Sequence, residues 1–129
     1  MSSKELFLYF HEGEIMSQVK IEEQIGGTIV ALKGQFIGGE ETDELRSILK
    51  TIVEQDKKNL IIDMEKVSYL NSTALGVLMS AHAHFAKNEG IIALCNLGKS
   101  IENLFVITKL TLVFQIYNTR EEAIKSISN

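Results

Sequence analysis

The chain has 129 residues, 45% of them hydrophobic, which predicts one globular domain whose core needs no metal or disulfide. Its formal net charge of −4 argues against general binding to nucleic acid or anionic membranes. Cys95 is the only cysteine, which excludes an intrachain disulfide and makes a reducing cytoplasm the expected compartment. No apolar run approaches the roughly 20 residues that span a bilayer, so no membrane insertion is expected.

The sequence of the N-terminal extension, residues 1–15, does not indicate whether this segment is folded. Residues 6–10 are five apolar residues without alternation, a pattern that fits an added strand, a partner-binding arm or a frayed leader. Residues 16–129 contain a complete domain pattern, so Met16 also resembles an alternative start.

The domain opens with a predicted β-hairpin. Residues 19–22 alternate apolar and polar side chains, as a half-buried strand does, and Gly26 with Gly27 is a turn signal. The β-branched residues of 28–32 predict the partner strand, which we expect Gly34 to end.

Residues 40–55 are predicted to form a helix, because apolar residues recur there at three- and four-residue spacing. Its first turn is rich in acidic side chains: Glu40, Glu41, Asp43 and Glu44. The positive end of a helix favours negative charge, so a solvated, dipole-matched helix start is the plain interpretation. An acidic docking patch is the alternative.

The central stretch combines a buried strand, a group of capping residues and a helix. Residues 60–64 form a short apolar run that predicts a buried strand, with Asp63 at its end. The sequence from Asn71 to Thr73 contains three residue types that cap helices. From Ala74 to Phe85 the apolar residues then follow helical spacing.

Strands and helices continue to alternate toward the C-terminus. Gly90 is expected to end the central helix in a left-handed conformation, and residues 91–95 predict another buried strand. Ser100 precedes a short helical pattern, and residues 112–117 are a candidate last strand. Thr119 begins a Thr-x-x-Glu capping box that opens a C-terminal helix.

This order of elements predicts the fold class. Strands that alternate with helices indicate a largely parallel sheet, and the opening hairpin makes the sheet mixed. We therefore expect a single α/β domain with a mixed, mostly parallel sheet flanked by about four helices.

Candidate catalytic residues are few. Cys95 lies within an apolar run, which predicts a buried and unreactive thiol. His82 and His84 are two residues apart, roughly 200° around a helix, and so do not form a metal-binding pair. A structural Asp63 that accepts hydrogen bonds from nearby amides is favoured over a catalytic carboxylate. We expect no cofactor, no metal site and no enzymatic activity.

Ser72 has two interpretations. It could cap the following helix by accepting a hydrogen bond from a free amide. Alternatively Asn71 is the cap, and Ser72 then lies in the first helical turn with its hydroxyl facing water. A phosphate of about −1.5 to −2 charge would be tolerated there, next to the positive end of the helix. A partner packed over Ser72 would not tolerate it, which would make an on/off switch without a change of fold.

The stretch from Leu60 through Asn71-Ser72-Thr73-Ala74-Leu75-Gly76 to Leu78 resembles the signature of STAS domains, specifically bacterial anti-sigma factor antagonists. The similarity extends over nearly the whole chain from about Val19. In this resemblance Ser72 falls on the phosphorylated serine of the family. The resemblance implies partner-binding residues at the same place: Asn71, Ser72, Thr73, Leu75 and Gly76.

The resemblance also implies a role in partner switching. The unphosphorylated protein would bind an anti-sigma factor that is also a serine kinase, and phosphorylation at Ser72 would release it. A cognate phosphatase would restore binding. The chain would be a cytoplasmic substrate of the kinase. The resemblance leaves open whether the chain forms a homodimer.

Three positions depart from the family pattern. Asn71 stands where members carry Asp, Ala74 replaces Gly, and Ile37 stands where many members carry an acidic residue. These differences bear on which kinase acts and whether it acts. They also fit an alternative function, a non-switching scaffold subunit of a lipid transporter or a signalling complex.

Overall fold

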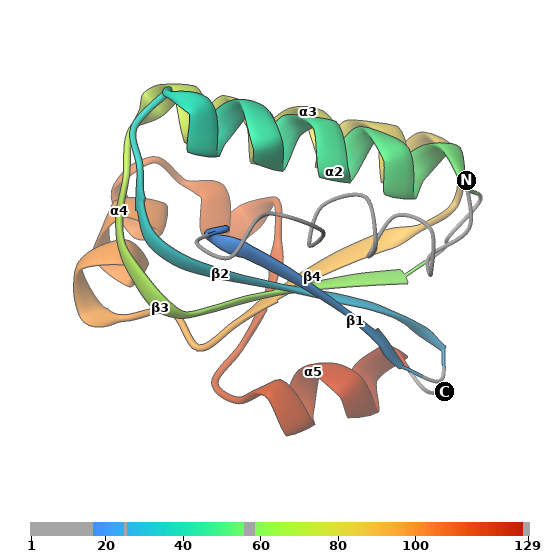
Figure 1. Cartoon of the computed structure of the whole chain (residues 1–129). Helices are drawn as coiled ribbons and strands as arrows, with labels where there is room; N and C mark the ends of the chain where they lie inside the picture. Colours follow the sequence, from blue (N-terminus) through green and yellow to red (C-terminus); the bar gives the residue numbers. More distant parts are fainter. Residues whose placement is uncertain (1–16, 25, 56–58, 128–129) are drawn as a thin grey trace.

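A computed structural model of the chain describes residues 17–24, 26–55 and 59–127 (Figure 1). Five strands form one sheet in the order β1-β2-β3-β4-β5. The strands are β1 (Val19–Gln24), β2 (Gly27–Phe36), β3 (Asn59–Leu70), β4 (Ile91–Cys95) and β5 (Gln115–Tyr117). The described helices are α2 (Glu40–Glu54), α3 (Ser72–Lys87), α4 (Lys99–Ile107), α5 (Arg120–Ile127) and the short 3-10 helix η1 (Leu110–Leu112).

The sheet is mixed and mostly parallel, which confirms the predicted α/β fold class. Strand β1 pairs antiparallel with β2, and Gly26, with φ 91°, occupies the turn between them. The remaining neighbours, β2 to β5, pair in parallel. Parallel neighbours need a crossover between them, and α2, α3 and α4 lie in these connections.

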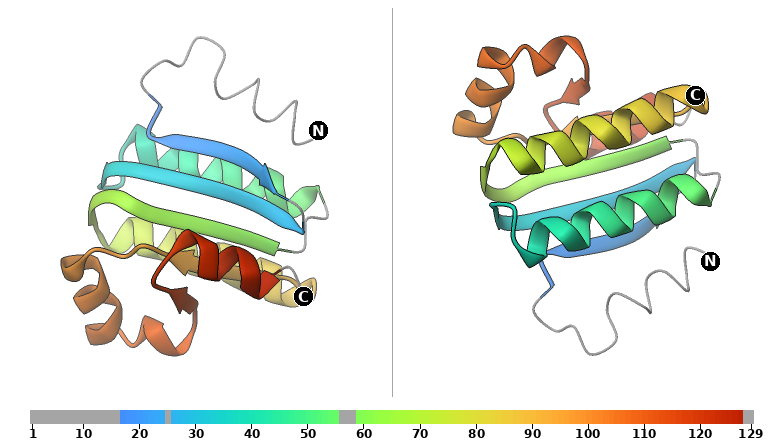
Figure 2. Two further views of the ribbon diagram at one scale, coloured as in Figure 1. Left: turned by 90° about the horizontal axis from the view of Figure 1, so that it is seen from below. Right: turned by 90° about the horizontal axis from the view of Figure 1, so that it is seen from above.

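Helices cover both faces of the sheet. α2 and α3 lie side by side over one face, and α5 covers the other (Figures 1 and 2). Successive strand side chains alternate between the faces, so Leu60 and Ile62 of β3 join the larger core cluster with α2 and α3. Ile61 between them joins the smaller cluster with Ala123 and Ile127 of α5. Burial on both faces explains why the central strand is a continuous apolar run.

Two strands are longer than predicted. The prediction that Gly34 ends the second strand is wrong, because β2 continues to Phe36. Gly34 has φ +83° and lies where the pairing with β3 shifts register, so it is an irregularity inside the strand. The prediction that Asp63 ends a strand is also wrong. β4 stops pairing with β3 at Asp63, but β2 goes on pairing as far as Leu70.

Two details of the C-terminal half also differ from expectation. The last strand contains residues 115–117 alone, because η1 occupies Leu110–Leu112 and exposes 83% of Leu112. The left-handed residue after α3 is Glu89, with φ 62°, rather than Gly90. The amide of Gly90 instead donates to the carbonyl of Phe85 at 2.6 Å, which still ends the helix where predicted.

The predicted helix starts are largely confirmed. α2 begins at Glu40, and α4 begins one residue before Ser100. Thr119 caps α5, since its hydroxyl accepts a hydrogen bond from the amide of Glu122 at 3.1 Å. The predicted extension, residues 1–15, lies outside the described residues. Within the described ranges, no helix has the length and apolar character required to cross a bilayer.

Candidate functional site

The two longest strands end together at the edge of the sheet where α2 and α3 begin. The amide of Asn71 donates to the carbonyl of Phe36 at 3.0 Å, which joins the residue after β3 to the last residue of β2. Gly38, with φ +85°, turns the chain from β2 into α2. A Cβ atom at Gly38 would lie 3.5 Å from Cβ of Thr73. The loop before α2 therefore rests against the first turn of α3.

Asn71, rather than Ser72, caps α3. Its Oδ1 accepts a hydrogen bond from the amide of Ala74 at 3.0 Å, and its carbonyl accepts one from the amide of Leu75 at 3.0 Å. Ser72 is consequently the first helical residue, and its side chain is exposed. Among the described residues, the hydroxyl of Ser72 has no hydrogen-bond partner. Of the two interpretations of this serine, the cap is therefore wrong and the exposed hydroxyl is confirmed.

We expect Asn71→Ala to lower the free energy of unfolding by about 1 kcal/mol, because the amide of Ala74 loses its acceptor. Ser72→Ala, one residue further on, is the matched control and should change stability by less than about 0.5 kcal/mol. Urea denaturation followed by circular dichroism measures both variants. Equal losses for the two variants would contradict the assignment of Asn71 as the cap.

The loop against α3 is held by the first turn of α2. Oε2 of Glu41 accepts hydrogen bonds from the amides of Ile37 and Gly39, at 3.0 and 3.1 Å, and one from the hydroxyl of Thr42. The Thr42 hydroxyl in turn accepts from the amide of Gly38 at 2.9 Å. The hydrogen bond from Thr42, together with those from the loop amides, lowers the pKa of Glu41. Glu41 therefore stays ionised and positions the loop.

Two further residues of the acidic cluster also have local partners. Asp43 forms an exposed ion pair with Arg46 at 2.6 Å, and Glu44 accepts a hydrogen bond from the hydroxyl of Ser17 at 2.7 Å. These contacts, with the position of the cluster at the start of α2, favour the plain interpretation of a dipole-matched helix start.

Several exposed side chains lie on the segments that meet here, namely the end of β3, the loop after β2 and the first turns of α3. We call the following residues the docking face: Ile37, Tyr69, Ser72, Thr73 and Gly76. Ile37 and Tyr69 are 52% and 51% exposed, although both are large and apolar in body. A Cβ atom added at Gly76 would meet nothing within 4 Å. Exposed apolar side chains beside an open helix surface are typical of a protein-binding site.

The other predicted partner-binding residues lie at or beneath this face. Asn71 is half-buried and engaged in capping. Leu75 is 8% exposed and packs in the larger core cluster, so it supports the docking face from below. Ala74 is fully buried, which places its methyl group in the core rather than on the docking face.

Asp63 lies at the centre of a polar network on the α5 side of the sheet. Its Oδ2 accepts a hydrogen bond from Nε of Arg120 at 2.8 Å. Its Oδ1 accepts from the amide of Glu65 at 3.0 Å and from Nδ2 of Asn96 at 3.1 Å. Arg120 also binds Glu22 of β1. The network therefore joins β1, β3, the loop after β4 and the start of α5.

The predicted structural role of Asp63 is confirmed, including its bond to a nearby amide. Burial raises the pKa of Asp63, but the hydrogen bonds from Glu65, Asn96 and Arg120 and the charge of Arg120 outweigh it. Its pKa therefore lies below the ordinary value for an aspartate, and the carboxylate is ionised at neutral pH.

The remaining candidates for catalysis or metal binding are Cys95, His82 and His84. Cys95 is buried, and burial together with the charge of Asp63 raises its pKa to about 12, so the thiol is unreactive as predicted. His84 is exposed, and the ring of His82 packs 5.2 Å from that of Phe114. Within the described part of the chain, no group of three His, Cys, Asp or Glu side chains could hold a metal ion.

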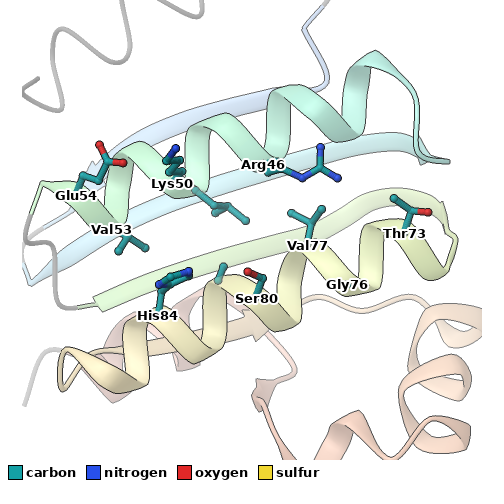
Figure 3. A pocket seen from close by; sticks show the side chains of 11 residues that line it. Arg46, Lys50, Val53, Glu54, Thr73, Gly76, Val77, Ser80 and His84 are labelled. Carbon is teal, nitrogen blue, oxygen red and sulfur yellow. The ribbon is translucent and has the colours of Figure 1, made fainter.

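Sequence reasoning missed two sets of residues. Arg120 is 57 residues from Asp63, and nothing in the sequence pairs the two. Arg46 and Lys50 of α2 line a groove between α2 and α3, but helical periodicity predicts which face of a helix is apolar and not which helix lies beside it (Figure 3).

Comparisons with known proteins agree with this architecture. The chain matches the STAS domain family over residues 17–123. The anti-sigma-B factor antagonist of Listeria monocytogenes is 31% identical over 91 residues, which cover 67% of this chain and 80% of that protein.

Solved structures show the same fold. An anti-sigma factor antagonist from Mycobacterium paratuberculosis superposes with a TM-score of 0.77, at 22% identity over 86% of this chain and 93% of that one. The phosphorylated form of the Bacillus cell fate determinant SpoIIAA gives 0.69, at 19% identity over 84% of this chain and 98% of that one. This chain therefore belongs to the STAS domain family, and its relatives include proteins named anti-sigma factor antagonists.

Proposed function

We propose that this STAS domain is a phosphoswitch that binds an anti-sigma factor. In this proposal the unphosphorylated chain binds an anti-sigma factor that is also a serine kinase, and so frees the sigma factor. Phosphorylation at Ser72 ends the complex, and a cognate phosphatase restores it. The chain is then a substrate of the kinase rather than an enzyme, and it acts in the cytoplasm.

The observation that carries the proposal is the exposed hydroxyl of Ser72 at the start of α3. Asn71 accepts the hydrogen bond from the free amide of Ala74 at the helix terminus. A phosphate on Ser72 would therefore not disrupt the cap of α3. A phosphate at this position would lie near free amides at the positive end of a helix, which favours negative charge. The fold would accept the modification without rearrangement.

A bound partner would not accept it. The docking face includes Ile37, next to the residue whose carbonyl binds the amide of Asn71, and Tyr69, three residues before Ser72. In this proposal the partner covers these apolar side chains together with the serine. Burying a phosphate without a matching cation carries a large desolvation cost. This difference in tolerance between the free chain and the complex is what makes a switch.

The relatives support the same assignment. The Listeria relative is named an anti-sigma-B factor antagonist, and the Bacillus structure is of a phosphorylated form. The three departures from the family pattern leave the docking face available, since Ala74 is buried, Asn71 is the cap and Ile37 adds exposed apolar surface.

The direct test is phosphorylation in vitro. The full chain is incubated with ATP, Mg²⁺ and each anti-sigma-type serine kinase encoded in the same genome, and the modified residue is located by mass spectrometry. We expect one phosphate on Ser72, none on Ser72→Ala and an unchanged yield on Thr73→Ala. Phosphate on Thr73, or on no residue with any of these kinases, would contradict the proposal.

The alternative function, a non-switching scaffold subunit, predicts different results for the same variants. A non-switching subunit would stay unphosphorylated and would co-purify with a membrane transporter or a signalling complex. Its complex would be equally stable with Ser72→Ala and with Ser72→Asp.

A further inference from the structure

The groove between α2 and α3 has the size of a small-molecule site. Its volume is about 570 Å³, and small-molecule pockets measure about 300–1,000 Å³. Its floor is aliphatic and comes from both helices: Leu49, Val53, Val77 and Ala81. Phe, Tyr and Trp are absent from the described residues that line it, so it offers no large ring on which a nucleobase would stack. The lining therefore favours an aliphatic ligand.

The α2 side of the groove carries two cations (Figure 3). Lys50 has no carboxylate partner among the described residues. Arg46 binds Asp43 at 2.6 Å, but a guanidinium has five N–H donors, so it can bind a second anion as well. The charged side chains among the described lining are these two cations and Glu54, so the lining is net positive although the whole chain has a formal net charge of −4. The two cations are complementary to an anion.

The two ends of the groove differ in charge. Arg46 and Thr73 lie at the end where α3 begins, and Glu54 and His84 lie at the other (Figure 3). The positive end of α3 adds to the field of Arg46 at the first end, and Glu54 would repel an anion at the second. The distance along α3 from Thr73 to His84 is about 16 Å at roughly 1.5 Å per residue. A ligand with a negative head and an extended chain matches this gradient.

We propose that the groove binds a free fatty acid, that is, a linear aliphatic carboxylate. Its carboxylate lies between Arg46 and Lys50, and its chain runs over Leu49, Val53 and Ala81 toward His84. The proposal does not depend on phosphorylation of Ser72. Because Thr73 and Gly76 belong both to the groove and to the docking face, an occupied groove changes the surface that a partner meets.

The test is isothermal titration calorimetry of the full chain with dodecanoate, below its aggregation concentration. We expect one saturable site. Dodecanol and dodecyltrimethylammonium, which share the chain but lack the negative head, should bind at least about tenfold more weakly, because the charge-assisted contacts are lost.

Two pairs of variants locate the site. Lys50→Glu should weaken dodecanoate binding by about tenfold or more, and Lys66→Glu, an exposed lysine of β3 outside the groove, should leave it within about twofold. Ser80→Trp should fill the groove and abolish binding. Ala83→Trp, on the same helix but outside the groove, should not. Lys50 and Ser80 line the groove, whereas Lys66 and Ala83 do not, so each pair separates occupancy of the groove from general effects on the fold.

Several results would overturn the proposal. They are the absence of saturable binding, equal binding of the alkyl cation, or unchanged dodecanoate binding by Ser80→Trp. A further experiment measures whether the chain sediments with phosphatidylglycerol vesicles. Vesicle binding that Lys50→Glu abolishes, without binding of free dodecanoate, would assign the cations to a membrane surface instead.

Discussion

Asp63→Ala is expected to lower the free energy of unfolding by about 2–4 kcal/mol. The substitution removes the acceptor for Arg120, Asn96 and the amide of Glu65, and it leaves these donors without their partner in a buried site. Arg120 keeps Glu22 as a partner, which limits the loss. Urea denaturation at neutral pH measures the effect. Asp63→Asn keeps one acceptor oxygen and should lose less, which gives a reading if the alanine variant does not fold.

Asp43→Ala is the matched control, because it also breaks an aspartate–arginine pair. That pair is exposed on α2, with side chains 69% and 53% exposed, and such pairs contribute less than about 1 kcal/mol. If the two variants lost the same stability, the buried network would not hold the sheet to α5.

The contribution of Asp63 should also depend on pH. Its pKa is lower in the folded chain than in the unfolded one, so the unfolded chain binds the proton more readily. The stabilisation is therefore complete above the ordinary aspartate pKa of about 3.9 and is lost as the pH falls through the lower, folded value. The difference in stability between the wild type and Asp63→Ala should accordingly shrink in acid. A difference that stayed constant down to the lowest pH at which the chain folds would contradict this assignment.

Ser72→Asp is expected to weaken binding of the anti-sigma kinase by about 10- to 100-fold, and Ser72→Ala is expected to keep the affinity within about twofold. The carboxylate imitates part of the charge of a phosphate, and a partner bound over the proposed docking face must desolvate it. The free chain should keep its stability, because an acidic side chain in the first turn of a helix contributes about 0.3–1 kcal/mol favourably. Calorimetry of the complex and urea denaturation of the free chain measure the two effects.

Ser100→Asp is the control for this substitution. Ser100 is also an exposed serine in the first turn of a helix, α4, so the same charge is added in the same local setting but outside the docking face. It should leave partner binding unchanged. Weak binding by both aspartate variants would mean that overall charge, rather than the docking face, controls the complex.

The sequence predicted the order of the strands and helices, because each depends on local periodicity. The helix that begins at Glu40, the buried strand that begins near Leu60 and the cap at Thr119 all follow from spacing and residue type alone. Two of the errors occurred where a neighbouring strand decides the outcome. Gly34 lies inside β2 and Asp63 inside β3 because these two strands pair along their whole length, and no local signal reports that pairing.

Ser72 illustrates the division within the site. The adjacent capping residues Asn71 and Ser72 left two interpretations open, because either side chain can reach a free amide of α3. The strand pairing decides between them. Pairing of β2 with β3 through Leu70, and the bond from the amide of Asn71 to Phe36, hold Asn71 in the extended conformation that precedes the helix.

The sequence by itself determined the fold class, the positions of the helices and the one stretch that carries a candidate switch. Only the tertiary structure decided that Asp63 binds Arg120, and that α2 and α3 enclose a groove with Lys50 on one side and Ser80 on the other. The physical reason is the distance along the chain between the residues that determine each feature. Caps and periodicity depend on residues within about one helical turn, whereas a polar network or a groove depends on which distant segments the sheet brings together.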